Sequence, residues 1–175
     1  NGLATTVTDP EGRSTTYTND AAGRLLAVQQ PNTTSGQLTM TYRYTPWGEL
    51  DQVQEGASGP VVTSSTYDER GFRTSMTDAD AGTWTYEYTV WGEVYRVRDA
   101  RTGSSNWTQT HTYDELGRLT QRVDFDPVTS TSATTEWQYY TATNGTLGQY
   151  KGQLQRATTY AAGVGSTKEF EETYT

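Results

Sequence analysis

The sequence predicts an all-β chain built from consecutive antiparallel β-hairpin repeats. Thr, Tyr, Trp and Val are abundant, and these residues favour the pleated, half-buried surface of a strand over a helix. Glycines at positions 23, 48, 71, 92 and 117 follow one another at intervals of 25, 23, 21 and 25 residues. Stretches that alternate aromatic with polar residues precede most of these glycines, as expected of strands that end in a turn.

The composition indicates that the core of this sheet is thin. Hydrophobic residues, Tyr included, make up 32% of the chain. Counting Gly in place of Tyr gives about 34%, whereas about 45 to 50% is typical of globular domains. Disordered chains are poor in aromatic residues and rich in charge, but here aromatic residues are 12% and charged residues 19%. An ordered but thin architecture follows.

Charge and cysteine content exclude several classes of function. A net charge of −8 argues against nucleic acid as a partner, because such affinity rests largely on Lys and Arg that neutralise phosphates. Insertion into a membrane is not expected, since no apolar run approaches the roughly 18 residues of a membrane span. The absence of cysteine removes disulfides and thiolate metal sites.

The strongest repeat unit is a five-residue turn. Tyr67–Gly71 (YDERG) recurs as Tyr113–Gly117 (YDELG). Weaker copies with glycine in the same place are Asn19–Gly23, Tyr44–Gly48 and Tyr88–Gly92. An Asp at the first turn position can accept backbone N–H groups, and the Gly three places later supplies the left-handed conformation of a type I turn with a G1 bulge. The predicted turn residues are Asp20, Gly23, Gly48, Asp68, Gly71, Gly92, Asp114, Gly117 and Gly152.

A strand is expected on each side of every turn. The aromatic pairs or triplets that precede the turns are Tyr42 with Tyr44, Trp84 with Tyr86 and Tyr88, His111 with Tyr113, and Trp137 with Tyr139. The apolar strands that follow are Leu25–Val28, Leu50–Val53, Val94–Val97 and Leu119–Val123. The odd spacing of the end residues in two of these strands, Leu50–Val53 and Val94–Val97, implies bulges or a change of face.

The repeats are expected to fill the whole chain, residues 1–175, as about seven units of one segment. An insertion near residues 140–151 separates Gly117 from the next matching glycine, Gly152. Both ends of the chain cut through a repeat, which suggests that the chain is an excerpt of a larger protein.

Three motifs give the chain a resemblance to a known family. Tyr67–Gly71, Tyr113–Leu119 (YDELGRL) and Val7–Gly12 (VTDPEG) resemble the repeats of the RHS/YD-repeat family, which includes bacterial toxins, toxin-complex B and C components, wall-associated proteins and teneurins. The resemblance implies a spiralling β-sheet that forms part of a shell. By this resemblance, the tyrosine of the family motif corresponds to Tyr44, Tyr67, Tyr88 and Tyr113. Asn19, Thr45 and Thr89 depart from the pattern, which indicates degenerate structural repeats.

The resemblance also implies a function. The chain would form the wall of a secreted or cell-surface shell that encapsulates or presents a toxin or effector domain. Its partners would be other repeats of the same parent chain and that enclosed domain. Such a wall is not an enzyme and needs no cofactor or metal, and the single histidine, His111, is expected to pack in an aromatic slot of its strand.

Trp47 and Trp91 are the candidate ligand-facing residues. Each directly precedes a turn glycine, where an indole at a loop tip can stack on a sugar ring. The simpler expectation is that both fold back over neighbouring hairpins and add to aromatic packing. The alternative functions are accordingly a carbohydrate- or receptor-binding repeat module, or a surface protein that self-associates through uncapped strand edges.

Overall fold

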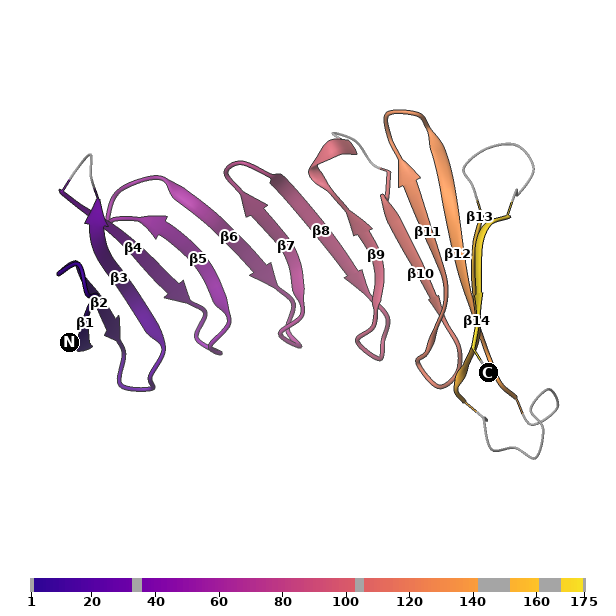
Figure 1. Cartoon of the computed structure of the whole chain (residues 1–175), viewed down its shortest axis with the longest axis horizontal. Coiled ribbons are helices and arrows are strands. Elements are labelled where there is room, and N and C mark those ends of the chain that lie inside the picture. Colours follow the sequence, from indigo (N-terminus) through magenta and orange to yellow (C-terminus); the bar gives the residue numbers. More distant parts are fainter. Residues whose placement is uncertain (1, 33–35, 103–105, 142–151, 161–167, 175) are drawn as a thin grey trace. The chain divides into compact units, whose positions relative to one another are not determined.

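The computed structural model describes residues 2–32, 36–102, 106–141, 152–160 and 168–174, and within them the regular structure is almost entirely β-strand (Figure 1). One 3-10 turn, η1 (Ala100–Thr102), is the exception among these residues. The strands are β1 (Leu3–Thr8), β2 (Ser14–Asn19), β3 (Leu25–Asn32), β4 (Gly36–Tyr44), β5 (Leu50–Glu55), β6 (Val61–Tyr67), β7 (Arg73–Asp78), β8 (Gly82–Tyr88), β9 (Val94–Arg98), β10 (Gln109–Tyr113), β11 (Leu119–Asp126), β12 (Thr131–Tyr139), β13 (Leu154–Tyr160) and β14 (Lys168–Thr173).

The chain divides into two compact units, Asn1–Thr83 and Trp84–Thr175. In the first unit each strand from β1 to β7 pairs antiparallel with the next strand along the chain. In the second unit the strands from β8 to β14 pair in the same consecutive way. The prediction of an all-β chain of consecutive antiparallel hairpins is therefore confirmed.

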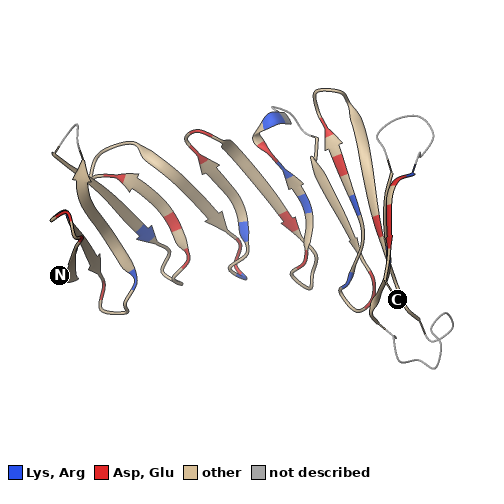
Figure 2. Cartoon of the chain, in the orientation of Figure 1, with Lys and Arg blue, Asp and Glu red and all other residues tan. Residues whose placement is uncertain are grey.

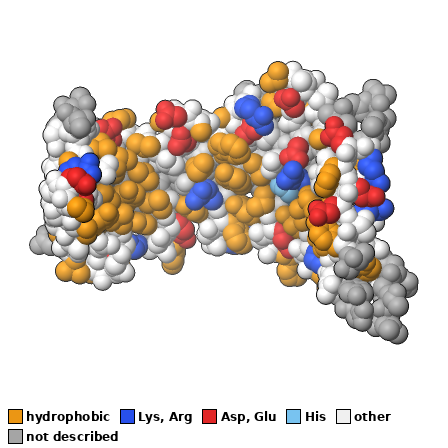
Figure 3. All heavy atoms as spheres, viewed as in Figure 1, with side chains coloured by type: hydrophobic (Ala, Val, Ile, Leu, Met, Phe, Trp, Pro, Cys, Tyr) orange, Lys and Arg blue, Asp and Glu red, His pale blue; other side chains and the backbone are white. Residues whose placement is uncertain are grey.

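Alternating side chains give the first unit one apolar face. Tyr17 of β2 lies opposite Val28 of β3, which in turn lies opposite Met40 of β4. Figure 3 shows hydrophobic side chains gathered on the viewed face of the first unit. Within the described part of the chain, Val97 is the one hydrophobic side chain that is buried, so packing across single strand pairs replaces a deep core.

In each unit a β-bulge lies beside the connections at one edge of the strands and explains the odd spacing of the apolar residues. Tyr44 pairs with Leu50, but the next residue back, Arg43, pairs with Gln52, so that Asp51 is an extra residue in β5. The same shift occurs at the end of β2, β6, β8, β10 and β12. An extra residue reverses the alternation of faces. Leu50 and Val53 can thus share a face although their spacing is odd.

In each unit the predicted turns lie along one edge of the strands (Figure 1), which we call the tight-turn edge. It carries the turns β2–β3, β4–β5 and β6–β7 in the first unit and β8–β9 and β10–β11 in the second. One turn of the same build, Asp9–Arg13 between β1 and β2, connects strands at the opposite edge.

Candidate functional site

The tight-turn edge is built from a five-residue hydrogen-bonded unit. In the turn that begins at Asp20, the carboxylate accepts the backbone N–H groups of Ala22 and Arg24, both at 2.9 Å. The Arg24 side chain donates its Nε–H to the second carboxylate oxygen at 2.7 Å. The Gly23 N–H closes the turn by donating to the Asp20 carbonyl at 3.0 Å. The turn Asp114–Arg118 repeats these contacts, so we call both Asp–Arg turns.

The turn that begins at Asp68 keeps the aspartate but moves the arginine. The Asp68 carboxylate accepts the N–H groups of Arg70 and Phe72, both at 2.9 Å. Arg70, at the third position, forms the ion pair at 3.0 Å, and its guanidinium lies 4.7 Å from the centre of the Phe72 ring. Figure 2 shows acidic and basic residues side by side at several of these turns.

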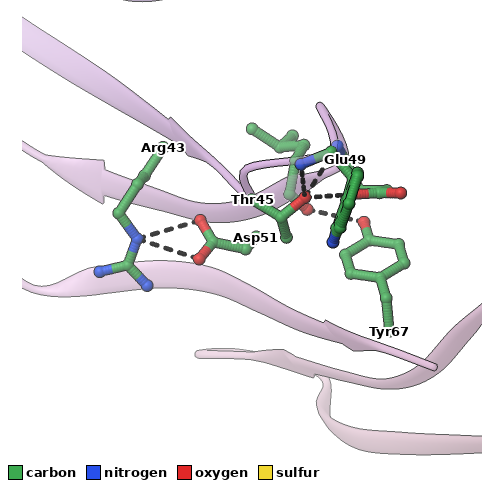
Figure 4. Close-up of polar contacts among 7 residues, drawn as sticks. Arg43, Thr45, Glu49, Asp51 and Tyr67 are labelled. Carbon is green, nitrogen blue, oxygen red and sulfur yellow. Dashed lines mark hydrogen bonds and ion pairs between the residues drawn. The ribbon is translucent and has the colours of Figure 1, made fainter. Parts of the chain in front are cut away.

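Thr45 and Thr89 build the same turn with reversed polarity. The Thr45 hydroxyl accepts the N–H groups of Trp47 at 3.3 Å and Glu49 at 3.2 Å, and it donates its own hydrogen to the Glu49 carboxylate (Figure 4). Thr89 makes the same contacts with Glu93. The hydroxyl thus takes the place of the aspartate, and a glutamate takes the place of the arginine at the fifth position. We call these Thr–Glu turns.

The turn glycines hold backbone conformations that other residues rarely adopt. Their φ angles are Gly23 83°, Gly48 104°, Gly71 82°, Gly92 97°, Gly117 73° and Gly152 85°. At two of them a neighbour is also close, because a Cβ placed on Gly71 or Gly117 would lie 3.0 Å from Oε1 of Glu49 or Glu93. The insertion expected near residues 140–151 lies almost wholly outside the described residues.

The repeat tyrosines connect one hairpin to the hairpin before it. The Tyr67 hydroxyl donates to the carbonyl of Leu50 at 2.7 Å (Figure 4), and the Tyr113 hydroxyl donates to the carbonyl of Val94 at 2.8 Å. In both cases the acceptor is the first residue after the preceding tight turn. Tyr139, which the repeat motif does not mark, makes the same bond to Leu119 at 2.8 Å. Tyr44 and Tyr88 occupy the same half-buried position at the ends of β4 and β8.

Replacing Tyr67, Tyr113 or Tyr139 with Phe should lower the free energy of unfolding by about 0.5 to 1.5 kcal/mol, because the hydroxyl-to-carbonyl bond is lost while the ring remains. Urea unfolding followed by circular dichroism measures this change. Tyr42→Phe is the matched control, since no hydrogen bond of the Tyr42 hydroxyl is found in the part of the chain that the structure describes. An equal loss in the control would contradict the proposed link between hairpins.

The turn aspartates give the fold a dependence on pH. The Arg118 hydrogen bond, which outweighs partial burial, together with two backbone N–H groups holds the pKa of Asp114 below its ordinary 3.8. The Arg24 side-chain bond and backbone N–H groups lower the pKa of Asp20 in the same way. A folded pKa below the unfolded value means that the stabilisation is complete above pH 3.8 and is lost as the pH falls through the folded pKa.

We therefore expect stability to decline below about pH 4 and to decline less steeply in Asp114→Asn. Urea unfolding between pH 2.5 and 7 on the two proteins measures the slopes. At pH 7 the free energy of unfolding of the variant should already be lower than that of the parent, because the variant lacks the ion pair with Arg118. Identical slopes would show that Asp114 is not a source of the acid sensitivity.

Trp47 and Trp91 do not fold back over neighbouring hairpins. Their exposed fractions are 89% and 86%, so the expectation that they pack is wrong. Each is the third residue of its Thr–Glu turn, between the strands on either side. The two indoles are therefore exposed to solvent.

His111 lies half-buried on β10, opposite Arg122 of β11. Burial, followed by the charge of Arg122, lowers the pKa of its ring. Among the residues that the structure describes, no group of three or more His, Asp or Glu side chains is placed to hold a metal ion. In the same residues, no helix has the length and apolarity to cross a membrane.

Sequence reasoning missed the fifth turn position, which decides the polarity of each turn. Read in order, the first and fifth residues are Asp20 with Arg24, Thr45 with Glu49, Asp68 with Phe72, Thr89 with Glu93, and Asp114 with Arg118. An alignment of the five turns on their glycines would have revealed that Asp goes with Arg and Thr with Glu at four of them.

Known proteins share this architecture. Residues 1–35 match the family model described as RHS Repeat. The crystal structures of TcdB2-TccC3-Cdc42 and TcdB2-TccC3-TEV each superpose on 96% of this chain with a TM-score of 0.67 and 17% identity. The Tc holotoxin pore of Photorhabdus luminescens superposes on 87% of it with a TM-score of 0.62 and 17% identity. The chain covers 9% of the first two of those chains and 8% of the third. None of the curated proteins matches it.

Consecutive hairpins, tied by tyrosines and closed by recurring polar turns, define the chain as a tandem-repeat β-scaffold. Residues 1–35 match the RHS repeat model, and turn glycines with the same left-handed conformation recur as far as Gly152, so the match and the repeated turn together extend the likeness along the chain.

Proposed function

We propose that the chain is a wall segment of an RHS shell that encapsulates or presents a toxin or effector domain. The observation that carries this proposal is a hydrogen bond, found at three places, that joins one hairpin to the hairpin before it. Tyr67, Tyr113 and Tyr139 bond to backbone carbonyls 17, 19 and 20 residues earlier, so hairpins add to one another without a deep core. A wall can be extended in this way by any number of units.

The likeness to solved structures supports the choice of a shell over other repeat architectures. Two of those structures are of TcdB2 and TccC3 together with a third component, which is Cdc42 in one and TEV in the other. By analogy, the partners of this chain would be further repeats of its parent protein and an enclosed domain. The location would be secreted or at the cell surface, and the role would be structural and not enzymatic.

Cryo-electron microscopy of the natural polypeptide that contains this chain tests the proposal. A closed wall around density for another domain is the expected result. Repeats that form an open sheet with no enclosed density would contradict encapsulation. Resistance of the enclosed domain to protease in the intact protein, and its digestion after the wall is unfolded in urea, would give independent support.

A second candidate function is a surface-binding module, which the exposure of Trp47 and Trp91 favours. In its carbohydrate-binding form, the tryptophan fluorescence of the chain should respond to a polysaccharide. A lack of response across a broad glycan panel would contradict that form.

A further inference from the structure

Each unit contains a groove between a Thr–Glu turn and the next tight turn along the edge. The first groove, of about 670 Å³, is lined by Trp47, Glu49, Tyr67 and Glu69 among others. The second groove, of about 330 Å³, is lined by Trp91, Glu93, Glu115 and Leu116 among others. The two grooves arise from equivalent positions of the repeat, and each has a highly exposed indole in its wall. We call them the Trp47 groove and the Trp91 groove.

The Asp–Arg turns show which kind of side chain occupies the equivalent position elsewhere along the edge. The guanidinium of Arg24 lies 5.1 Å from the centre of the Tyr44 ring, and that of Arg118 lies 4.3 Å from the centre of the Tyr139 ring. In both cases the arginine at the end of one turn covers the tyrosine of the following hairpin. A guanidinium on an aromatic face is a favourable contact, and these arginines come from the chain itself.

The Thr–Glu turns put a carboxylate where the Asp–Arg turns put a guanidinium. Glu49 precedes the hairpin of Tyr67, and Glu93 precedes the hairpin of Tyr113. Burial and the charge of Glu93 raise the pKa of the Tyr113 hydroxyl, as expected when a carboxylate replaces a cation beside the ring. At these two positions the preceding turn therefore supplies a carboxylate and no arginine, although Arg73 of the same hairpin lies 6.0 Å from the centre of the Tyr67 ring.

The negative charge in the grooves is only partly compensated. Glu69 and Glu115 are exposed at the tips of the next turns, and no ion pair to either is found among the described residues. Arg70 also lines the Trp47 groove, but it pairs with Asp68. An indole beside an unpaired carboxylate recognises a planar cation, because the ring face and the carboxylate both attract positive charge.

We propose that the Trp47 and Trp91 grooves each bind an arginine side chain of a basic partner polypeptide. Its guanidinium would stack on the indole and pair with Glu69 in one groove and with Glu115 in the other. The net charge of −8 favours the approach of such a partner. This inference does not depend on the shell role, because the grooves lie at the tight-turn edge whatever the wall encloses.

Nuclear magnetic resonance of the chain labelled with ¹⁵N tests the proposal through the indole N–H signals of its five tryptophans. Trp47→Phe and Trp91→Phe assign the two relevant signals. Addition of acetyl-tri-arginine amide should move these two signals in a saturable way and leave the other three in place. The same peptide with citrulline, the neutral isostere of arginine, should move neither signal.

Charge variants separate the two grooves. Glu115→Gln should weaken the binding seen at Trp91 by roughly two- to five-fold and leave Trp47 unaffected, while Glu69→Gln should do the reverse. Asp80→Asn, an exposed acidic residue in the β7–β8 turn, is the matched control and should change neither. Equal shifts with the citrulline peptide, or no shift with the arginine peptide, would overturn the proposal. A response of both indoles to maltohexaose but not to the arginine peptide would overturn it in favour of a sugar-stacking platform.

Discussion

Gly71→Val is expected to lower the free energy of unfolding by about 2 to 3 kcal/mol, a large part of the 5 to 15 kcal/mol typical of a domain. Two costs add at this position. A β-branched residue is disfavoured at a φ of 82°, and its Cβ would lie 3.0 Å from the Glu49 carboxylate. Because the Thr45 hydroxyl holds that carboxylate, it cannot simply swing away. Urea unfolding followed by circular dichroism measures the loss.

Gly23→Val is the matched control for this experiment. Gly23 has nearly the same φ, 83°, and lies on the same edge of the same unit, but no atom lies within 4 Å of its hypothetical Cβ. Gly23→Val should lower the free energy of unfolding only by the strain of a valine in the left-handed backbone conformation, about 1 to 2 kcal/mol. If Gly23→Val and Gly71→Val lose equal stability, the contact with Glu49 contributes nothing. If Gly71→Val is as stable as the parent, the turn assignment itself is wrong.

The second large effect is expected from exchanging the two kinds of turn. Thr45→Asp alone should destabilise the fold by about 1 to 3 kcal/mol, because two carboxylates would then face each other across the turn. Glu49→Arg alone should cost about 1 kcal/mol, since the Thr45 hydroxyl loses its acceptor. The double variant recreates the Asp–Arg turn and should recover most of the loss.

A double-mutant cycle on urea unfolding measures the coupling between Thr45 and Glu49, which we expect to be about 1 to 2 kcal/mol. The control cycle combines Thr45→Asp with Glu11→Arg, because Glu11 lies at the opposite edge of the sheet and should show no coupling. Additive losses in the Thr45–Glu49 cycle would mean that the two kinds of turn are not alternative solutions of one geometry.

Much of this architecture could be predicted because the residues that determine each turn and strand lie close together in the sequence. The positions of the turns follow from the glycine at the fourth place, and the Asp20 and Asp114 contacts to backbone N–H groups follow from the chemistry of aspartate in turns. Alternating aromatic residues locate the strands that enter the turns. Each of these features is set within about ten residues of sequence.

The features that sequence reasoning missed depend on neighbouring hairpins. The bond from Tyr67 to the Leu50 carbonyl requires the register of three strands, which the bulge after each turn shifts by one residue. The expectation that Trp47 packs was also wrong, because it rested on the rule that large aromatic residues are usually buried in cores. Within each unit, the described strands pair only with their neighbours along the chain, so a turn residue has no second layer to pack against among the described residues.

The tyrosine hydrogen bonds can form only in a set order during synthesis, because each tyrosine lies after its acceptor in the sequence. Each hydroxyl reaches back 17 to 20 residues, so a hairpin leaving the ribosome gains its last fastening only when the following hairpin has been made. Growth of the sheet can therefore keep pace with synthesis, since each closure spans a short loop and needs no distant partner. At the three positions where this bond is found, a half-finished chain would leave unbonded only the hairpin that still awaits its tyrosine, which limits the apolar surface exposed there to about one repeat.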